Sequence, residues 1–150
     1  MSIYDWGKFG FHIPEIMIPK DGTDYGKWAV VACDQYTSEP EYWEDAEKIV
    51  GDAPSTLRLM LPEIYLEKEG EAEKIAKIRE TMARYMEDGT LQKLPKGCML
   101  VHRTAEGRSR VGLVIATDLE SYDFNRGSSS LTRDTEVTFV ERIPPRLRIR

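Results

Sequence analysis

The clearest element in this sequence is one amphipathic helix near the middle of the chain. Residues 71–88 carry apolar side chains at helical spacing, with acidic residues in the first turn, where negative charge suits the helix dipole. The Asp88-Gly89 pair then ends the pattern. The apolar stripe consists of Ile75, Ile78, Met82, Tyr85 and Met86. Nothing in this helix indicates catalysis.

A second helix is predicted over residues 39–50 and is ended by Gly51. Ser38 and Glu41 have capping-box spacing, and Pro40 falls in the first turn, where its missing N–H costs nothing. The apolar face of this helix consists of Tyr42, Trp43, Ala46, Ile49 and Val50. We expect these aromatic side chains in the core rather than stacked on a ligand.

Several segments have the patterns of strands. Residues 28–33 (WAVVAC) form an uninterrupted apolar run that suits a strand buried on both faces. Residues 57–66 begin with the alternating side-chain pattern of a strand, and the proline within them, Pro62, favours an edge strand or a break in the strand. Residues 98–104 and 110–117 flank a polar turn at 106–109, as in an antiparallel hairpin. The predicted class is α+β (mixed α/β), with a small mixed sheet, an antiparallel hairpin and two or three helices.

Composition places the chain among single globular domains. Its 150 residues, 41% apolar and 31% charged, suffice for one core, so residues 1–150 are expected to form a single domain. No apolar run approaches the roughly 20 residues that span a bilayer, and no leader pattern opens the chain, so we expect a cytoplasmic protein without a membrane partner. Cys33 and Cys98 match no metal or disulfide spacing and are expected to be free, mostly buried thiols. No metal site is predicted.

The charges are distributed unevenly. Residues 126–150 hold six Arg against three Asp or Glu, a local balance of +3, so the first 125 residues carry −8 within the total of −5. The acidic body argues against nucleic acid as a partner. The basic end suits a small anion, because guanidinium groups match phosphate and carboxylate bidentately. Alternatively, these arginines lie on an exposed strand and pair with nearby glutamates.

Two groups of polar residues are candidates for ligand binding. Asp34, Gln35 and Tyr36 follow the strand predicted at 28–33, and strand exits are usual ligand sites in open sheets. The alternative is that they cap turns before the next helix. The second group begins in a Gly-Ser segment, whose backbone N–H groups suit phosphate, and continues into the arginine-rich end. Its candidate anion-binding residues are Ser128, Arg133, Thr135, Glu136, Arg142 and Arg146.

The end of the sequence predicts that the polypeptide continues. Residues 147–150 alternate apolar and charged side chains, as a half-buried strand does, and no turn or tail follows. We therefore expect an N-terminal part of a longer chain. A fragment of this kind exposes apolar surface, which favours self-association into a homo-oligomer.

Four motifs together resemble the N-terminal part of a bacterial family, domain of unknown function 1015. They are residues 11–16 (FHIPEI), 28–43 (WAVVACDQYTSEPEYW), 54–57 (PSTL) and 141–146 (ERIPPR), and the resemblance covers essentially the whole chain. The family typically has small residues where this chain has Asp134 and Val137. The added carboxylate of Asp134 would weaken anion binding next to it.

The resemblance implies a longer bacterial protein of unknown function. The family's C-terminal part contains a segment similar to the phosphate-handling motif of the ParB, sulfiredoxin and free serine kinase group, and this sequence lacks it. By that analogy the whole protein binds a nucleotide with magnesium or a small phosphorylated ligand, and any phosphotransferase-like activity belongs to the full-length protein. Arg133 and Arg142 would neutralise phosphate oxygens, and Thr135 and Ser128 would donate hydrogen bonds. The alternative is a non-catalytic scaffold or interaction module that covers a neighbouring domain or subunit.

Overall fold

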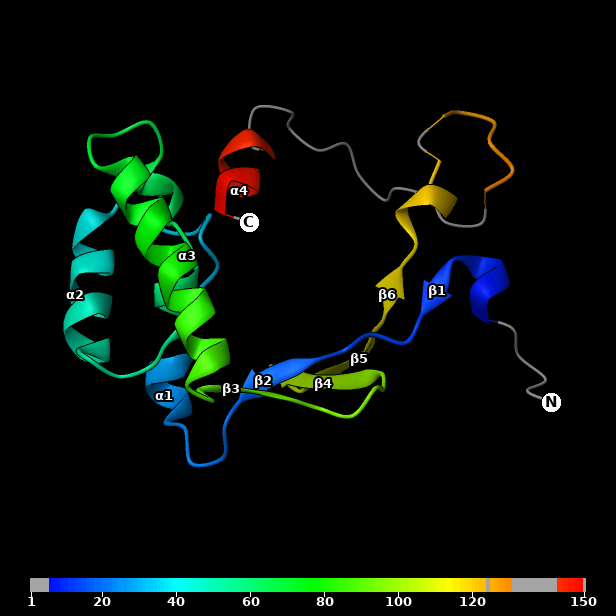
Figure 1. Cartoon of the computed structure of the whole chain (residues 1–150), viewed down its shortest axis with the longest axis horizontal. Coiled ribbons are helices and arrows are strands. Elements are labelled where there is room, and N and C mark those ends of the chain that lie inside the picture. Colours follow the sequence, from blue (N-terminus) through cyan, green and yellow to red (C-terminus); the bar gives the residue numbers. More distant parts are fainter. Residues whose placement is uncertain (1–5, 124, 131–142, 150) are drawn as a thin grey trace. The chain divides into compact units, whose positions relative to one another are not determined.

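A computed structural model describes residues 6–123, 125–130 and 143–149 of the chain (Figure 1). The chain divides into two compact units, which we call the hairpin unit (Met1–Met17 and Lys93–Thr138) and the helical unit (Ile18–Gln92 and Phe139–Arg150). Helices and small two-stranded sheets occur together, so the predicted α+β class is confirmed. The described strands form three pairs rather than one mixed sheet: β1 (Phe11–His12) with β6 (Ala116–Thr117), β2 (Met17–Pro19) with β3 (Leu91–Lys93), and β4 (Met99–Ala105) with β5 (Arg108–Val114).

The helical unit contains most of the described helices. Two long helices, α2 and α3, are joined by two short 3-10 helices, and a short C-terminal helix completes the unit (Figure 1). The elements are β2 (Met17–Pro19, shared with the hairpin unit), α1 (Tyr25–Trp28), α2 (Pro40–Val50), η2 (Thr56–Leu59), η3 (Glu63–Tyr65), α3 (Glu71–Glu87), β3 (Leu91–Lys93, also shared) and α4 (Ile143–Ile149).

Helix α2 confirms the helix predicted over residues 39–50, with two differences. Trp43 and Val50 are buried as expected, but Ile49 is 65% exposed. The predicted capping box does not form, because Glu39 occupies the N-cap position without a side-chain hydrogen bond and Pro40 begins the helix. Gly51 ends the helix with a φ of 54°, in the left-handed region that glycine adopts at little cost.

Helix α3 confirms the clearest prediction from the sequence. Ile75, Ile78 and Tyr85 are buried along one face, and the helix ends at Asp88. Met86 lies at the edge of the predicted stripe and is exposed. The amphipathic pattern therefore located both the helix and its inward face.

Two predicted strands are wrong. Within residues 28–33, Trp28 ends helix α1, and the residues after it form no strand. Residues 57–66 form most of η2 and all of η3, and Pro62 is the N-cap of η3. Both segments pack their apolar side chains against helices. A short apolar run has the same pattern in such a segment as in a buried strand, so periodicity alone could not separate them.

The core of the helical unit consists of two apolar clusters. The first contains Trp43, Val50, Leu57 and Ile64, and the second contains Leu61, Ile75 and Ile78. Tyr65 packs against both clusters from η3. The long helices and the 3-10 segments between them thus share a continuous packed surface.

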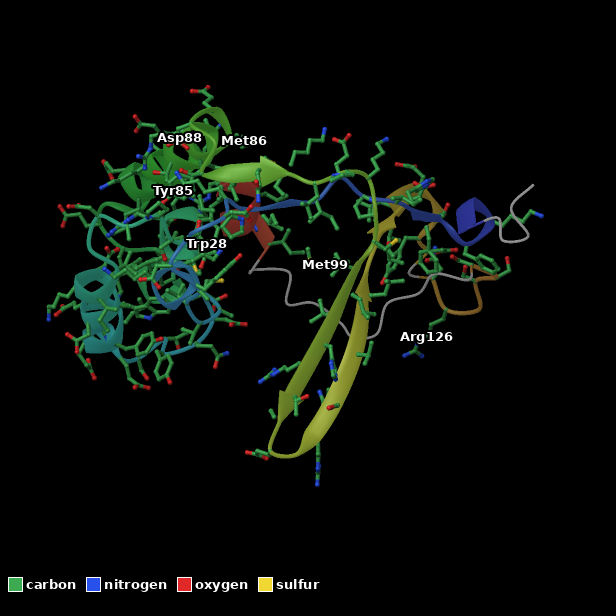
Figure 2. The ribbon with its side chains drawn as sticks, turned by 90° about the horizontal axis from the view of Figure 1, so that it is seen from below. Trp28, Tyr85, Met86, Asp88, Met99 and Arg126 are labelled. Carbon is green, nitrogen blue, oxygen red and sulfur yellow. The ribbon has the colours of Figure 1, made fainter. Side chains whose placement is uncertain are left out.

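A buried polar network holds the segment before η2 in place. Ser55 is fully buried; its backbone N–H donates to Tyr85 Oη (3.1 Å), and its hydroxyl donates to the carbonyl of Trp28 (3.2 Å). Thr56 Oγ1 donates to the same carbonyl at 2.8 Å. The rings of Trp28 and Tyr85 lie together, with centroids 6.1 Å apart (Figure 2). The network supplies partners for backbone groups that burial removes from water.

The hairpin unit is built around β4 (Met99–Ala105) and β5 (Arg108–Val114), which extend from Met99 as an antiparallel ribbon (Figure 2). The predicted hairpin is confirmed, but the turn has two residues, Glu106 and Gly107, instead of four or five, and the second strand ends at Val114 because Ala116–Thr117 forms β6. Both turn residues have positive φ, 51° and 72°, as a tight I′-type turn requires. The unit also contains η1 (Trp6–Phe9), β1 (Phe11–His12), β6 (Ala116–Thr117) and η4 (Leu119–Ser121).

Two further predictions are corrected. Residues 147–149 belong to helix α4 rather than a strand, and Ile149 packs against the cluster of Leu61, Ile75 and Ile78. Alternation over a few residues was too short to exclude a helix, and prolines are tolerated in a first helical turn. Cys33 and Cys98 are not joined by a disulfide, but Cys98 is exposed and Cys33 is only partly buried, so the expectation of mostly buried thiols is wrong for Cys98.

Candidate functional site

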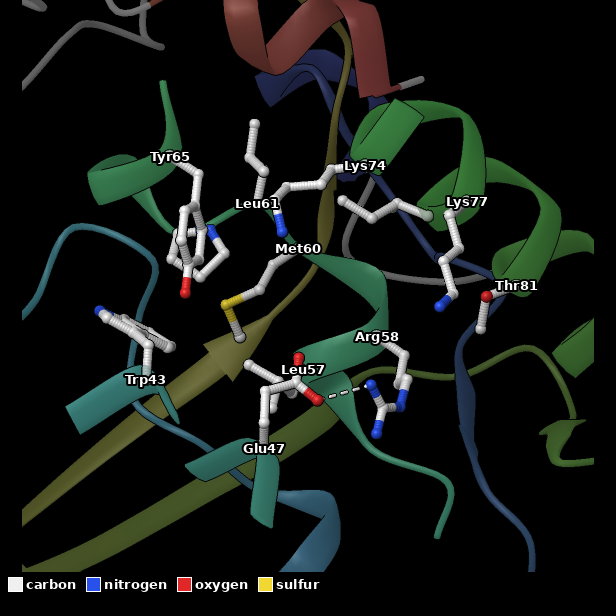
Figure 3. A pocket seen from close by; sticks show the side chains of 12 residues that line it. Trp43, Glu47, Leu57, Arg58, Met60, Leu61, Tyr65, Lys74, Lys77 and Thr81 are labelled. Carbon is white, nitrogen blue, oxygen red and sulfur yellow. Dashed lines mark hydrogen bonds and ion pairs between the residues drawn. The ribbon is translucent and has the colours of Figure 1, made fainter. Parts of the chain in front are cut away.

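A small pocket lies within the helical unit, between α2, η2, η3 and α3 (Figure 3). Its volume is about 130 Å³. The apolar part of its wall comes from the core clusters, and two aromatic side chains, Trp43 and Tyr65, stand at one side. The apolar lining residues are Leu57, Met60, Leu61, Pro62 and Ile78. The pocket therefore adjoins the buried core of the helical unit.

Three cationic side chains surround this pocket. Arg58 comes from η2, and Lys74 and Lys77 come from α3, where an i,i+3 spacing puts them on neighbouring positions of one helix face (Figure 3). Glu47 is the only acidic residue among the described lining residues. Formal charges therefore leave an excess of two positive charges around an apolar cavity.

The cations differ in how they are already engaged. Arg58 Nη1 lies 2.8 Å from Glu47 Oε2, and its Nη2 donates to the carbonyl of Gly51, so this guanidinium is held in place. Lys74 Nζ stands over the ring of Tyr65, 4.4 Å from its centroid. The Lys77 side chain makes no ion pair or hydrogen bond with any residue that the structure describes. The two lysines can thus bind a ligand without first breaking an ion pair with a carboxylate.

The phenol of Tyr65 remains protonated at neutral pH. Desolvation by burial raises its pKa above the ordinary value of 10.0, and the nearby carboxylates of Glu47 and Glu44 raise it further. A protonated phenol can donate a hydrogen bond. Thr81, 6% exposed, adds a hydroxyl to the wall on the α3 side (Figure 3). The pocket therefore combines cations, hydroxyl groups and apolar surface.

Sequence reasoning did not find this pocket. Arg58 lies in a segment that was predicted as a strand. In the sequence, Lys74 and Lys77 have the pattern of an ordinary solvent-exposed helix face. The one available signal was that Lys74 and Lys77 flank the apolar stripe of α3, next to Ile75 and Ile78, rather than lying opposite to it. Only the fold brings Arg58 to the same opening.

Asp34, Gln35 and Tyr36 lie outside this pocket, in the turn before α2. All three are exposed. Asp34 Oδ1 accepts a hydrogen bond from Gln35 Nε2 at 3.3 Å, and Gln35 donates its backbone N–H to Ala32. Tyr36 stacks on Tyr42, with ring centroids 3.9 Å apart. These contacts are those of a turn that leads into a helix, and ligand binding by these residues stays a prediction from the sequence.

Ser128 lies in the hairpin unit, beside a carboxylate. Its hydroxyl donates to Asp123 and accepts from the backbone N–H of Ser130 at 3.0 Å. Asp123 also accepts from the backbone N–H of Asn125 at 2.9 Å. A hollow beside these residues is lined by Lys8, Ser121 and Asp123 as well as by Ser128 and its neighbours. The single lysine and the carboxylate of Asp123 balance each other there.

The remaining predicted anion-binding residues are not placed. Arg133, Thr135, Glu136 and Arg142 lie outside the described residues. The backbone of Arg146 is part of α4, but its side chain is also outside the described part. Their grouping into one site therefore stays a prediction from the sequence.

Within residues 6–123, 125–130 and 143–149, no three His, Cys, Asp or Glu side chains come together in a way that suits a metal ion. None of the helices in this described part has the length and apolar composition needed to cross a bilayer.

The fold and the pocket define a small α+β protein with a cation-rimmed cavity. Over residues 17–150 the chain matches the family model described as protein of unknown function (DUF1015). The chain belongs to this family, as the resemblance in its sequence predicted. Neither the curated proteins nor the solved structures contain a match to it.

Proposed function

We propose that the chain is a binding protein for a small anionic ligand, phosphorylated or carboxylated, and that the helical unit's pocket is where the ligand binds. The observation that carries this proposal is the convergence of Arg58, Lys74 and Lys77 on one cavity that has a single carboxylate in its described lining. Guanidinium and ammonium groups donate charge-assisted hydrogen bonds to phosphate and carboxylate oxygens. Apolar walls strengthen such bonds by excluding water.

The size of the cavity limits the ligand. A cavity of about 150 Å³ accepts a molecule the size of benzene, and this one has about 130 Å³. A phosphate or carboxylate on a body of a few carbon atoms fits, whereas a nucleotide exceeds the enclosed space. The aromatic rings of Trp43 and Tyr65 favour a flat or apolar body.

The pocket supports binding rather than catalysis. Its described lining contains no His, Cys or Ser, and its one carboxylate, Glu47, is paired with Arg58 at 2.8 Å, which disfavours a role as a general base. Phosphoryl transfer from a nucleotide with magnesium, expected from the family resemblance, depends on Arg133 and Arg142 and on a segment that this sequence lacks. It stays a prediction for a longer, full-length protein in a bacterial cytoplasm.

Calorimetric titration of the 150-residue chain tests the proposal. Phenyl phosphate and benzoate should bind, and benzyl alcohol, which has the ring without the charge, should not. Lys77→Gln should weaken the affinity for phenyl phosphate about tenfold or more, since a hydrogen bond to a charged group contributes about 1.5–3 kcal/mol. Lys68→Gln is the control, because Lys68 is exposed and does not line the pocket. Equal binding to both variants, or equal binding of the alcohol, would reject the proposal.

The alternative is a non-catalytic scaffold without a small-molecule ligand. It predicts no heat with any of the three compounds and no effect of Lys77→Gln beyond a small change in stability. Thermal unfolding of the same variants separates the two functions. A ligand that binds the folded state raises the melting temperature as its concentration rises, whereas a scaffold shows a flat response.

A further inference from the structure

The β4–β5 hairpin exposes apolar side chains on both of its faces. Leu100 is 66% exposed, Val111 65% and Leu113 53% on one face, and Val101 and Val114 are also exposed on the other. A single two-stranded ribbon is at best marginally stable in water. Apolar residues on both faces are typical of strands that are covered by other elements. The exposed hairpin therefore has the composition of an element that takes a partner.

The register gathers three arginines on one face near the tip. Arg103 lies directly opposite Arg110. Arg108 is two residues from Arg110 on the same strand, so it points to the same face. Like charges directly opposite each other destabilise a strand pair. Residues 99–114 contain one acidic residue, Glu106 in the turn, so nothing within the ribbon offsets these charges except that one carboxylate.

Both long edges of the ribbon are open in the described structure, where β4 and β5 pair only with each other. The two-residue turn makes Ala105 and Arg108 a hydrogen-bonded pair, and the pairs alternate from there. His102 and Val111 therefore direct their backbone N–H and C=O groups outward, on opposite edges. These groups are available to an added strand.

We propose that the β5 edge of this hairpin binds an extended strand of another polypeptide that alternates acidic and apolar residues. Its backbone would pair with the outward groups at Val111, and its carboxylates would lie beside Arg108 and Arg110. The intervening apolar side chains would extend the face of Leu100, Val111 and Leu113. The β5 edge is chosen because two of the three arginines lie on that strand.

The charges select this occupant over two others. The same hairpin of a second copy brings the same three arginines, so ribbon-to-ribbon pairing adds like-charge repulsion. Nucleic acid is disfavoured because the chain as a whole carries −5. An acidic strand supplies both the missing backbone partners and the missing negative charge.

Fluorescence anisotropy with the whole chain tests this proposal. The probes are a labelled peptide of alternating valine and glutamate, a peptide with lysine in place of glutamate, and a labelled single-stranded oligonucleotide. We expect binding of the glutamate peptide alone, with an affinity that falls as salt rises. The variant Arg108→Glu/Arg110→Glu should lose at least tenfold in affinity, while the charge reversal Arg79→Glu, at an exposed position of α3, should bind like the wild type.

Backbone variants locate the edge. Val111→Pro removes an outward N–H from β5 and should abolish peptide binding. His102→Pro makes the same change on the β4 edge and should leave peptide binding unchanged. Because a proline can disturb the ribbon, the arginine variant, which keeps the backbone intact, is the primary test. Binding of the oligonucleotide instead of the peptide would overturn the proposal. So would peptide binding that survives the arginine reversal, or an arginine reversal that only makes the chain aggregate.

Discussion

The helical unit and the hairpin unit use apolar residues in opposite ways. Every buried hydrophobic side chain in the described part of the chain belongs to the helical unit, from Trp28 to Tyr85. In β4 and β5 of the hairpin unit, only Met99 is even partly buried. One unit therefore has its own core and a pocket built into it, and the other presents a ribbon suited to contact. The packed core and the pocket both lie in residues 18–92.

Removal of a core side chain from the helical unit should have the largest effect. Trp43 is 1% exposed and belongs to the first core cluster, so Trp43→Ala should lower the free energy of unfolding by about 3–5 kcal/mol. Leu113→Ala in the hairpin should change it by only about 0.5 kcal/mol, because Leu113 is 53% exposed. Urea unfolding followed by circular dichroism measures both. Similar losses for the two variants would remove the distinction between the units.

The buried polar network should have a smaller but specific effect. Tyr85→Phe removes the hydroxyl that accepts the N–H of Ser55 and leaves that donor buried without its partner. The expected loss is about 1–3 kcal/mol, with little change in the helical circular dichroism signal. Tyr25→Phe is the matched control, since Tyr25 is 62% exposed. An equal loss of stability in the two variants would show that the buried hydrogen bond to Ser55 does not stabilise the fold.

The contact between α4 and α3 should contribute less. Arg148 Nη2 lies 2.7 Å from Oε1 of Glu71, whose other oxygen accepts the backbone N–H of Glu67. The Arg148 side chain is more than half exposed, so Arg148→Ala should cost about 1 kcal/mol, at the upper end for a solvent-screened pair. Denaturant unfolding in low and high salt measures it. A difference between Arg148→Ala and wild type that is unchanged by salt would contradict an ion-pair contribution.

The smallest predicted effect depends on pH and is confined to the hairpin unit. The hydroxyl of Ser128, and then the amides of Asn125, donate to Asp123 and hold the pKa of its carboxyl below the ordinary value of 3.8. The turn is therefore fully stabilised above pH 3.8, and the stabilisation is lost as the pH falls through the lower folded pKa. An NMR titration of the Asn125 amide should show its midpoint below 3.8. A midpoint at or above that value would contradict these hydrogen bonds.

The sequence predicted the elements with long or strongly patterned signals. The 3.6-residue period of α3, the stop at Gly51 after α2 and the paired apolar runs around Gly107 were sufficient to place two helices and the hairpin. It failed at residues 28–33 and 57–66, where short apolar runs pack against helices instead of forming strands. In a run of only four to ten residues, the apolar pattern does not distinguish a buried strand from a segment that packs against helices.

The candidate site was less predictable than the fold. Arg58 and the pair Lys74 and Lys77 come together only because η2 packs on α3, a tertiary contact without a local signature. The residues selected from the sequence were chosen for chemistry and spacing. Of these, Asp34, Gln35 and Tyr36 lie in the turn before α2, and Ser128 is hydrogen-bonded to a carboxylate in the hairpin unit.

Native-state hydrogen exchange tests the contrast between the units most directly. Amides in α3 and at Ser55 should exchange only through global unfolding, because they lie in or beside the packed core. Amides that β4 and β5 bond to each other should exchange through local opening, with protection well below that of α3. Equal protection of the hairpin and α3 would show that β4 and β5 are covered in the free protein and would contradict the account.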